Sequence, residues 1–206
     1  MRRTDRLTHL VLIASMVLAW PAVARSAQAV VGQPAPVFSL TDTHGAPRSL
    51  SAFKGRWVVL EWSNPECPFV RKHYDSGNMQ RLQRTYTARG VTWLTIISSA
   101  PGKQGHVSSE QANAIIAQRG AAQTAMLLDP DGAVGRLYGA KTTPHMFIVD
   151  PAGVLVYAGA IDDKPSTDPA DVATATNYVE RALEEADRDQ TISIPQTRPY
   201  GCSVKY

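Results

Sequence analysis

The chain has 206 residues and a formal net charge of +3, but this charge is unevenly distributed. Residues 1–29 hold four of the 21 basic and one of the 18 acidic residues, so the rest carries 17 of each and is neutral. A neutral chain has no general attraction for nucleic acid or an anionic membrane, and neither is an expected partner. The length suits one domain with its own core.

The first 29 residues have the features of a secretory signal peptide. Basic residues at positions 2, 3 and 6 precede an apolar run, and the small-residue sequence Ala27-Gln28-Ala29 follows it. Ala22-Val23-Ala24 is a second candidate cleavage site. The run of about 15 residues is too short to span a bilayer comfortably, although an uncleaved anchor is the alternative. We expect residues 1–29 to be removed and the protein to be periplasmic or otherwise exported.

The first half of the remaining chain predicts a hairpin, a strand and a helix. Residues 36–51 predict a β-hairpin that turns at His44-Gly45, and residues 56–62 predict an apolar strand. A loop rich in turn-forming residues follows. Residues 69–90 then predict a helix with an irregularity at Asp75-Ser76-Gly77.

The second half continues the alternation. Residues 91–98 predict a strand buried on both faces, and Ser108 with Gln111 predicts a capping box that opens a helix over residues 108–120. A strand at 125–129 and a short helix within 129–140 follow. Strands at 145–150 and 154–161 are joined by a tight turn, which predicts an antiparallel pair.

The last predicted helix is amphipathic and is capped by Asp168 or Asp171. Its apolar face contains Val172, Ala175, Val179, Leu183 and Ala186. Residues 191–206 show no helical period. Because parallel strands need helical crossovers, this order predicts an α/β fold, with a mixed sheet between helices and an N-terminal hairpin.

Cys67 is the main candidate for catalysis. It follows an apolar strand and precedes a helix, where free N–H groups and the helix dipole favour a thiolate. Arg71 and Lys72 add positive charge nearby, and Glu66 opposes them. A thiolate is the nucleophile in disulfide exchange and in peroxide reduction. A buried, inert cysteine is the alternative, but the polar loop around Cys67 favours a reactive thiol.

Thr143-Pro144 is the second candidate feature. Pro144 opens a predicted strand, a position at which a sheet tolerates proline. A cis peptide bond there would expose the backbone of Thr143 for pairing with an extended substrate. An ordinary trans proline is the alternative.

Several motifs together resemble a known family. NPECPFV (residues 64–70) and GCSVKY (residues 201–206) resemble peroxiredoxin-like redoxins of the alkyl hydroperoxide reductase and thiol-specific antioxidant group, and the resemblance covers residues 31–206. KTTPHMFIVDPAGVLVYAG (residues 141–159) resembles the thioredoxin superfamily. The resemblance implies a thioredoxin-like domain over residues 30–188 and a tail over residues 189–206. It also implies thiol chemistry at Cys67 and a cis proline at Pro144 beside it, with Thr143 and Pro144 in substrate binding.

The chain departs from the family patterns at three positions. Thioredoxins use C-x-x-C, but Val70 stands where the second cysteine would be. Peroxiredoxins use P-x-x-x-T-x-x-C, but Leu60 and Asn64 stand at the proline and threonine positions. We expect Cys202 to supply the missing thiol through a tail that folds back over the loop of Cys67. An unpaired, exposed thiol is the alternative for Cys202.

Three functions remain open from the sequence. The first is a thiol–disulfide oxidoreductase with Cys67 as nucleophile and Cys202 as resolving thiol, and the second is a peroxiredoxin-like peroxidase. The third is a metal-carrying or non-catalytic binding module, with Cys67, Cys202 and His145 as candidate ligands. We predict no cofactor and no resident metal, because no ligand pair has metal-site spacing. The expected partners are a protein thiol, a disulfide or a hydroperoxide, and a thiol electron donor, while the oligomeric state stays open.

Overall fold

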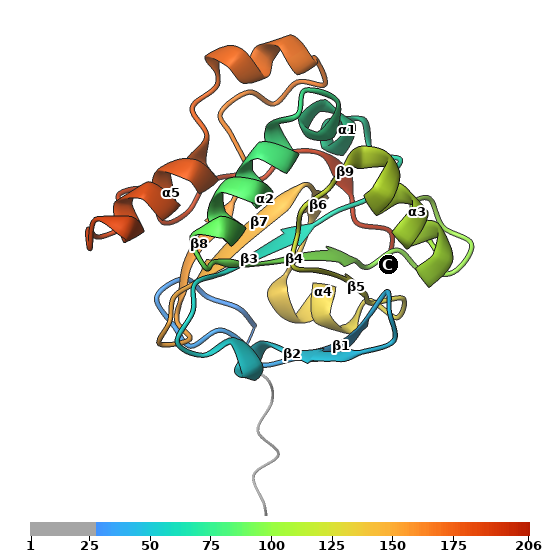
Figure 1. Ribbon diagram of the computed structural model, residues 1–206, viewed down its shortest axis with the longest axis horizontal. Helices are drawn as coiled ribbons and strands as arrows, with labels where there is room; N and C mark the ends of the chain where they lie inside the picture. Colours follow the sequence, from blue (N-terminus) through green and yellow to red (C-terminus); the bar gives the residue numbers. More distant parts are fainter. Residues whose placement is uncertain (1–27) are drawn as a thin grey trace, which may run out of the picture.

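The computed structural model describes residues 28–206, so nearly all of the predicted signal peptide lies outside the described residues. A mixed sheet of seven strands forms the centre of this part of the chain, in the order β2-β1-β5-β4-β3-β7-β8 (Figure 1). The strands are β1 (Ser39–Asp42), β2 (Pro47–Ser49), β3 (Val58–Trp62), β4 (Thr92–Ile97), β5 (Ala125–Leu128), β7 (His145–Val149) and β8 (Leu155–Gly159).

The pairing of these strands follows from their connections. β3, β4 and β5 are parallel and are joined through helices, whereas the β1–β2 and β7–β8 pairs are antiparallel hairpins. The first hairpin turns at Gly45, which has the left-handed φ of +83° that such a turn requires. The predicted α/β fold class and its N-terminal hairpin are confirmed.

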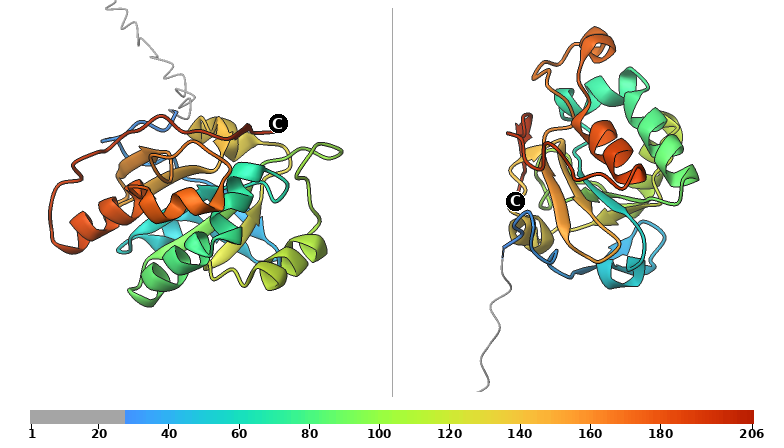
Figure 2. Two further views of the ribbon diagram at one scale, coloured as in Figure 1. Left: turned by 90° about the horizontal axis from the view of Figure 1, so that it is seen from above. Right: turned by 90° about the vertical axis from the view of Figure 1, so that its left-hand side faces the viewer.

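Helices pack on both faces of the sheet. They are α1 (Pro68–Asp75), α2 (Asn78–Ala88), α3 (Ser109–Arg119), α4 (Ala133–Tyr138) and α5 (Tyr178–Asp187). Helices α1, α2 and α5 share one apolar cluster on one face, while α4 packs against the other face (Figure 2). The predicted irregularity separates α1 from α2 at Ser76-Gly77, and the predicted capping box of Ser108 and Gln111 is present.

The prediction of one long final helix is wrong. Pro169–Thr174 forms a 3-10 helix capped by Asp168, and α5 begins separately after Asn177, whose side chain accepts a hydrogen bond from the N–H of Glu180. The chain between them is extended and pairs with the segment after β8, where Thr176 N–H donates to the Asp163 carboxylate. This pairing takes the backbone groups that a continuous helix would have used, although Val179 and Leu183 are buried as expected.

The C-terminal tail contains no helix, as predicted, and runs along one side of the domain (red in Figure 2). Its strand β9 (Cys202–Ser203) pairs antiparallel with β6 (Thr142–Thr143), the two residues before the proline that precedes β7. The last residue, Tyr206, donates a hydrogen bond to the carbonyl of Ala140 beyond the end of α4. No helix within residues 28–206 has the length and apolar character needed to cross a membrane.

Candidate active site

Cys67 lies at the junction of β3 and α1. It is the N-cap of α1, with Pro68 in the first helical position, where the missing N–H costs nothing. The Cys67 carbonyl accepts the first helical hydrogen bond, from Arg71 at 2.9 Å. The predicted placement of this cysteine at a helix start is confirmed, and its side chain is fully buried.

The loop before Cys67 is organised by Asn64, which is almost fully buried. The Asn64 carboxamide oxygen accepts from the N–H of Glu66 at 2.9 Å, and its nitrogen donates to the Gln104 carbonyl at 3.3 Å. The residue at the peroxiredoxin threonine position is therefore engaged in holding the loop.

The peptide bond between Thr143 and Pro144 is cis, as predicted. This places the carbonyl oxygen of Thr143 3.1 Å from the Cys67 sulfur. The predicted proximity of this dipeptide to Cys67 is confirmed, although 76 positions separate Thr143 from the cysteine.

Cys202 lies against Cys67 as well. Its Sγ lies 2.7 Å from Cys67 Sγ across 135 positions of the chain, and both cysteines are free. The two sulfurs are therefore in direct contact, although they are further apart than the roughly 2.05 Å of a disulfide bond. The structure thus brings together Cys67, Thr143, Pro144 and Cys202, the predicted catalytic and substrate-binding residues.

The tail occupies the backbone edge at which an extended substrate was expected to pair. In the β6–β9 pair, Thr142 is opposite Ser203 and Thr143 is opposite Cys202. The backbone of Thr143 is therefore already paired within the chain. An extended polypeptide has to displace residues 202–203 before it can pair there.

The two thiols differ in acidity. Burial raises the pKa of Cys67, but hydrogen bonds with the Cys202 and Thr143 side chains and with the N–H groups of Val70 and Cys202 bring it below its ordinary value. Burial and the adjacent Cys67 sulfur raise the pKa of Cys202 to about 12. Cys67 is consequently the more acidic thiol of the pair, and Cys202 keeps its proton at neutral pH.

The charges that the sequence placed near Cys67 have other roles. Lys72 is fully buried and lies 3.4 Å from the Asp162 carboxylate, while Arg71 is exposed and lies 3.9 Å from Asp75. Hydrogen bonds, rather than these two cations, are the main factors that lower the pKa of Cys67.

His145, the histidine considered as a metal ligand, forms no metal site with the two cysteines in the described part of the chain. His145 is buried against Phe147, with ring centroids 4.3 Å apart, and its Nδ1 accepts from the N–H of Lys141 at 3.3 Å. Burial first, and then the charge of Lys141, lower the pKa of His145 to about 3. Among residues 28–206, no three His, Cys, Asp or Glu side chains are grouped so that they could hold a metal ion.

Sequence reasoning missed two features of the site. The first is the Thr143 hydroxyl, which is buried with no hydrogen-bond partner in the described part of the chain and is one of the groups that lower the pKa of Cys67. The second is a buried polar cluster around Asp162, which reaches the tail through Tyr200. A local signal existed for Thr143, which precedes the key proline, but nothing near Asp162 in the sequence indicates its partners.

Comparison with known proteins agrees with this geometry. The model of the AhpC/TSA family matches residues 31–158. The chain belongs to the AhpC/TSA family. The predicted family resemblance is therefore confirmed. No curated protein sequence matches the chain.

Solved structures with the same fold as this AhpC/TSA protein come from several bacteria. A hypothetical protein from Sinorhizobium meliloti 1021 is 22% identical, with a TM-score of 0.73 over 86% of this chain and 94% of that one. An uncharacterized conserved protein from Geobacillus kaustophilus is 24% identical, with a TM-score of 0.74 over 86% and 92%. The thioredoxin domain of a thiol-disulfide oxidoreductase from Bacteroides vulgatus is 22% identical, with a TM-score of 0.50 over 63% and 87%. The thioredoxin-like fold is confirmed.

Proposed function

We propose that this AhpC/TSA thiol redox protein is a thiol–disulfide oxidoreductase whose working pair is Cys67 and Cys202. The observation that carries the proposal is the 2.7 Å separation of the two sulfurs. An internal disulfide needs a second thiol, and this chain has no C-x-x-C motif to provide it. The C-terminal tail provides it instead, by placing Cys202 beside Cys67.

The exchange reaction follows from the difference in acidity. The Cys67 thiolate attacks one sulfur of a substrate disulfide, forms a mixed disulfide and releases the other substrate sulfur as a thiolate. Cys202 then loses its proton and attacks Cys67 Sγ. The Cys67–Cys202 disulfide forms, and the second substrate thiolate leaves. A dithiol donor reverses these steps and takes both sulfurs back to the reduced state.

Access to Cys67 requires the tail to move. Cys67 is fully buried beneath the tail, whereas Cys202 is partly exposed. In the oxidised protein a donor thiol therefore meets Cys202 first and releases Cys67, the better leaving group because its pKa is lower.

Peptide mapping under non-reducing conditions tests the proposal. The oxidised wild-type protein is expected to yield one linked peptide that joins Cys67 to Cys202 within a chain. The Cys202→Ser variant is expected to stall as a mixed disulfide between Cys67 and a model disulfide such as oxidised glutathione. A wild-type protein that forms no internal disulfide, or Cys67→Ser that exchanges normally, would contradict the proposal.

A peroxidase reaction is the second candidate, and the family match favours it. The Cys67 thiolate would attack a hydroperoxide, take one oxygen to become a sulfenic acid and release an alcohol once the leaving oxygen is protonated. Cys202 would then form the disulfide and release water. Intact mass of Cys202→Ser after stoichiometric peroxide separates the two functions. Rapid gain of one oxygen at Cys67 supports the peroxidase, and unchanged mass excludes it.

We also propose that the protein is exported, on the basis of the N-terminal pattern. N-terminal sequencing of the protein from the cell envelope is expected to begin at Val30, or at Arg25 if the earlier site is cleaved. Full-length protein recovered from the cytosol would contradict export.

A further inference from the structure

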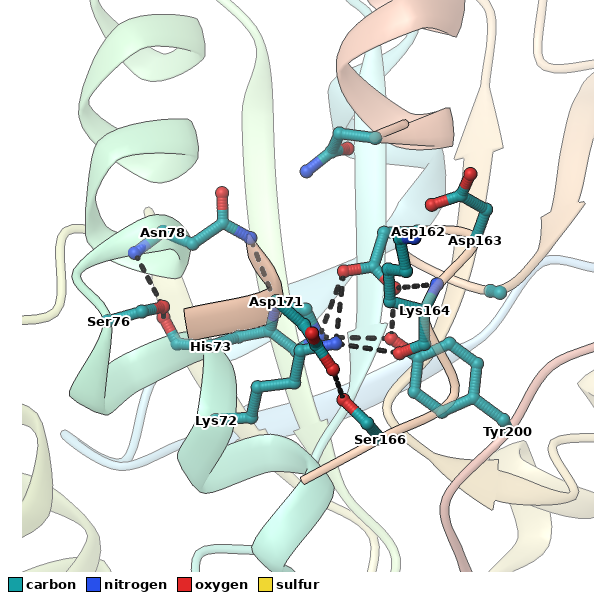
Figure 3. Close-up of polar contacts among 12 residues, drawn as sticks. Lys72, His73, Ser76, Asn78, Asp162, Asp163, Lys164, Ser166, Asp171 and Tyr200 are labelled. Atoms are coloured by element: carbon teal, nitrogen blue, oxygen red, sulfur yellow. Dashed lines mark hydrogen bonds and ion pairs between the residues drawn. The ribbon is translucent and has the colours of Figure 1, made fainter. Parts of the chain in front are cut away.

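A buried ion pair joins α1 to the segment after β8 (Figure 3). Lys72, in α1, and Asp162, after β8, are both almost completely buried, and Lys72 Nζ lies 3.4 Å from the Asp162 carboxylate. Lys72 Nζ also donates to the carbonyl of Lys164 at 2.7 Å, while the N–H of Lys164 donates to Asp162 at 3.0 Å. Burying two charges is costly unless both are well hydrogen-bonded, so this pair calls for an explanation.

Tyr200 connects the tail to this pair. Its hydroxyl donates a short hydrogen bond to Asp162 and contacts His73 Nε2 at 3.3 Å. On the other side of the ring, His73 Nδ1 lies 3.0 Å from the carboxamide nitrogen of Asn78. If Asn78 donates to Nδ1 of His73, then Nε2 of His73 carries the proton and donates to the Tyr200 hydroxyl. That hydroxyl in turn donates to Asp162, so each donor in this hydrogen-bonded series has one acceptor.

The Tyr200 ring makes a second set of contacts. It packs edge-on against Phe69 with centroids 5.9 Å apart, and Lys72 Nζ lies 5.7 Å from its centroid. Phe69 is two residues after Cys67, and Tyr200 is two residues before Cys202. Each ring is therefore two residues away from one of the two cysteines, so contact between the rings helps to hold the two segments together.

We propose that Tyr200 is a positioning residue, a latch that holds Cys202 against Cys67, with the Lys72–Asp162 pair as its receptor on the domain. The inference rests on the proposed pairing of the two cysteines. When the tail lifts, Asp162 loses one donor but becomes open to water, which replaces it. The latch can therefore open for a substrate and close again without leaving a buried charge unpaired.

Tyr200→Phe tests the latch, because it keeps the ring and removes the hydroxyl. The equilibrium constant for forming the Cys67–Cys202 disulfide in glutathione buffers is expected to fall about tenfold, as for loss of a hydrogen bond to a charged group. Alkylation of Cys67 in the reduced protein is expected to become faster. The matched control is Tyr178→Phe, which removes a hydroxyl from the same concave surface and is expected to change neither quantity.

The outcomes separate the latch from the proposed function. If the wild-type protein forms no internal disulfide, the proposed function fails. If it does, but Tyr200→Phe leaves the equilibrium constant and the alkylation rate unchanged, the latch alone is wrong. Thermal unfolding of reduced Tyr200→Phe checks that the domain is folded. Should that variant not fold, Phe69→Leu tests the ring contact, with an expected fall of about threefold, and no change there would overturn the latch.

Discussion

The pKa of the Cys67 thiol is lowered by individual hydrogen-bonding groups. Burial alone would make this thiol less acidic, yet the pKa is below its ordinary value because several donors converge on the sulfur. The Thr143 hydroxyl is the group most easily tested, since it has no hydrogen-bond partner among residues 28–206 that its removal would leave unpaired.

We predict that Thr143→Val raises the pKa of Cys67. With one donor fewer the thiolate is less favoured, so alkylation of Cys67 at pH 7 is expected to slow about fivefold and its pH midpoint to move upward. The measurement is the iodoacetamide rate against pH, resolved by mass spectrometry. Thr142→Val is the matched control, because that hydroxyl donates to the Pro144 carbonyl instead. Equal midpoints for the two variants would show that Thr143 has no such role.

His73 is expected to make the fold sensitive to acid. Burial lowers its pKa to about 4 in the folded state, against about 6.5 when unfolded. Between these values the unfolded chain binds a proton that the folded protein does not. The contribution of the neutral His73 side chain to the free energy of unfolding is thus complete above pH 6.5. It is lost as the pH falls toward 4, by about 3 kcal/mol in total.

Urea denaturation at pH 7, 5.5 and 4.5 measures this loss. His73→Gln is expected to be less stable at pH 7 but to lose less between pH 7 and 4.5 than the wild-type protein. His44→Gln, at an exposed hairpin turn, is the control and is expected to follow the wild-type profile. A His73→Gln variant with the full wild-type pH dependence would assign the acid sensitivity to other groups.

At the scale of elements, the docking of the tail is the decisive arrangement. Strand β9 has two residues and cannot form a stable pair with β6 by itself. Its position depends on what flanks it: Tyr200 on one side, and on the other Val204, whose N–H donates to the Lys141 carbonyl at 3.1 Å. Gly201 joins Tyr200 to Cys202 at a point where the tail backbone presses against Thr143.

Gly201→Ala is expected to displace the tail. Gly201 has a φ of +136°, and a Cβ there would collide with the carbonyl group of Thr143. Cys67 should then become accessible, with alkylation at least about tenfold faster, and the internal disulfide should form less readily. Gly153→Ala is the matched control, since Gly153 also has positive φ but has open space around it. Equal effects of the two substitutions would show that backbone conformation, not the collision, matters.

At the scale of the whole molecule, the proposed disulfide would join two distant parts of the chain. Linking Cys67 to Cys202 closes a loop of 135 positions, which in the chain-entropy model stabilises the folded state by up to about 5 kcal/mol. The oxidised protein is therefore expected to unfold at higher urea than the reduced protein. Cys202→Ser should show no difference between oxidising and reducing conditions. Equal midpoints for the oxidised and reduced wild-type protein would mean that the tail is unlinked or strained.

Local patterns were sufficient for most of the architecture. Alternating hydrophobicity and turn residues predicted the hairpins, the strands and the interrupted helix, because each depends on residues close together in sequence. The position of Cys67 at a helix start was predicted for the same reason, whereas the cis proline was expected from the family resemblance. The prediction of one long final helix failed because the Asn177 cap and the pairing of Thr176 with Asp163 interrupt an apolar pattern that looks continuous in the sequence.

The sequence by itself determined the fold class, the position of a cysteine at a helix start and the existence of a second thiol on a non-helical tail. Only the tertiary structure decided that the tail pairs with Thr143, that Lys72 faces Asp162 instead of Cys67, and that Tyr200 reaches this buried pair. These contacts join segments up to 90 positions apart. Periodicity reports which face of an element is buried, but not which distant side chain it meets, because that depends on how the elements pack.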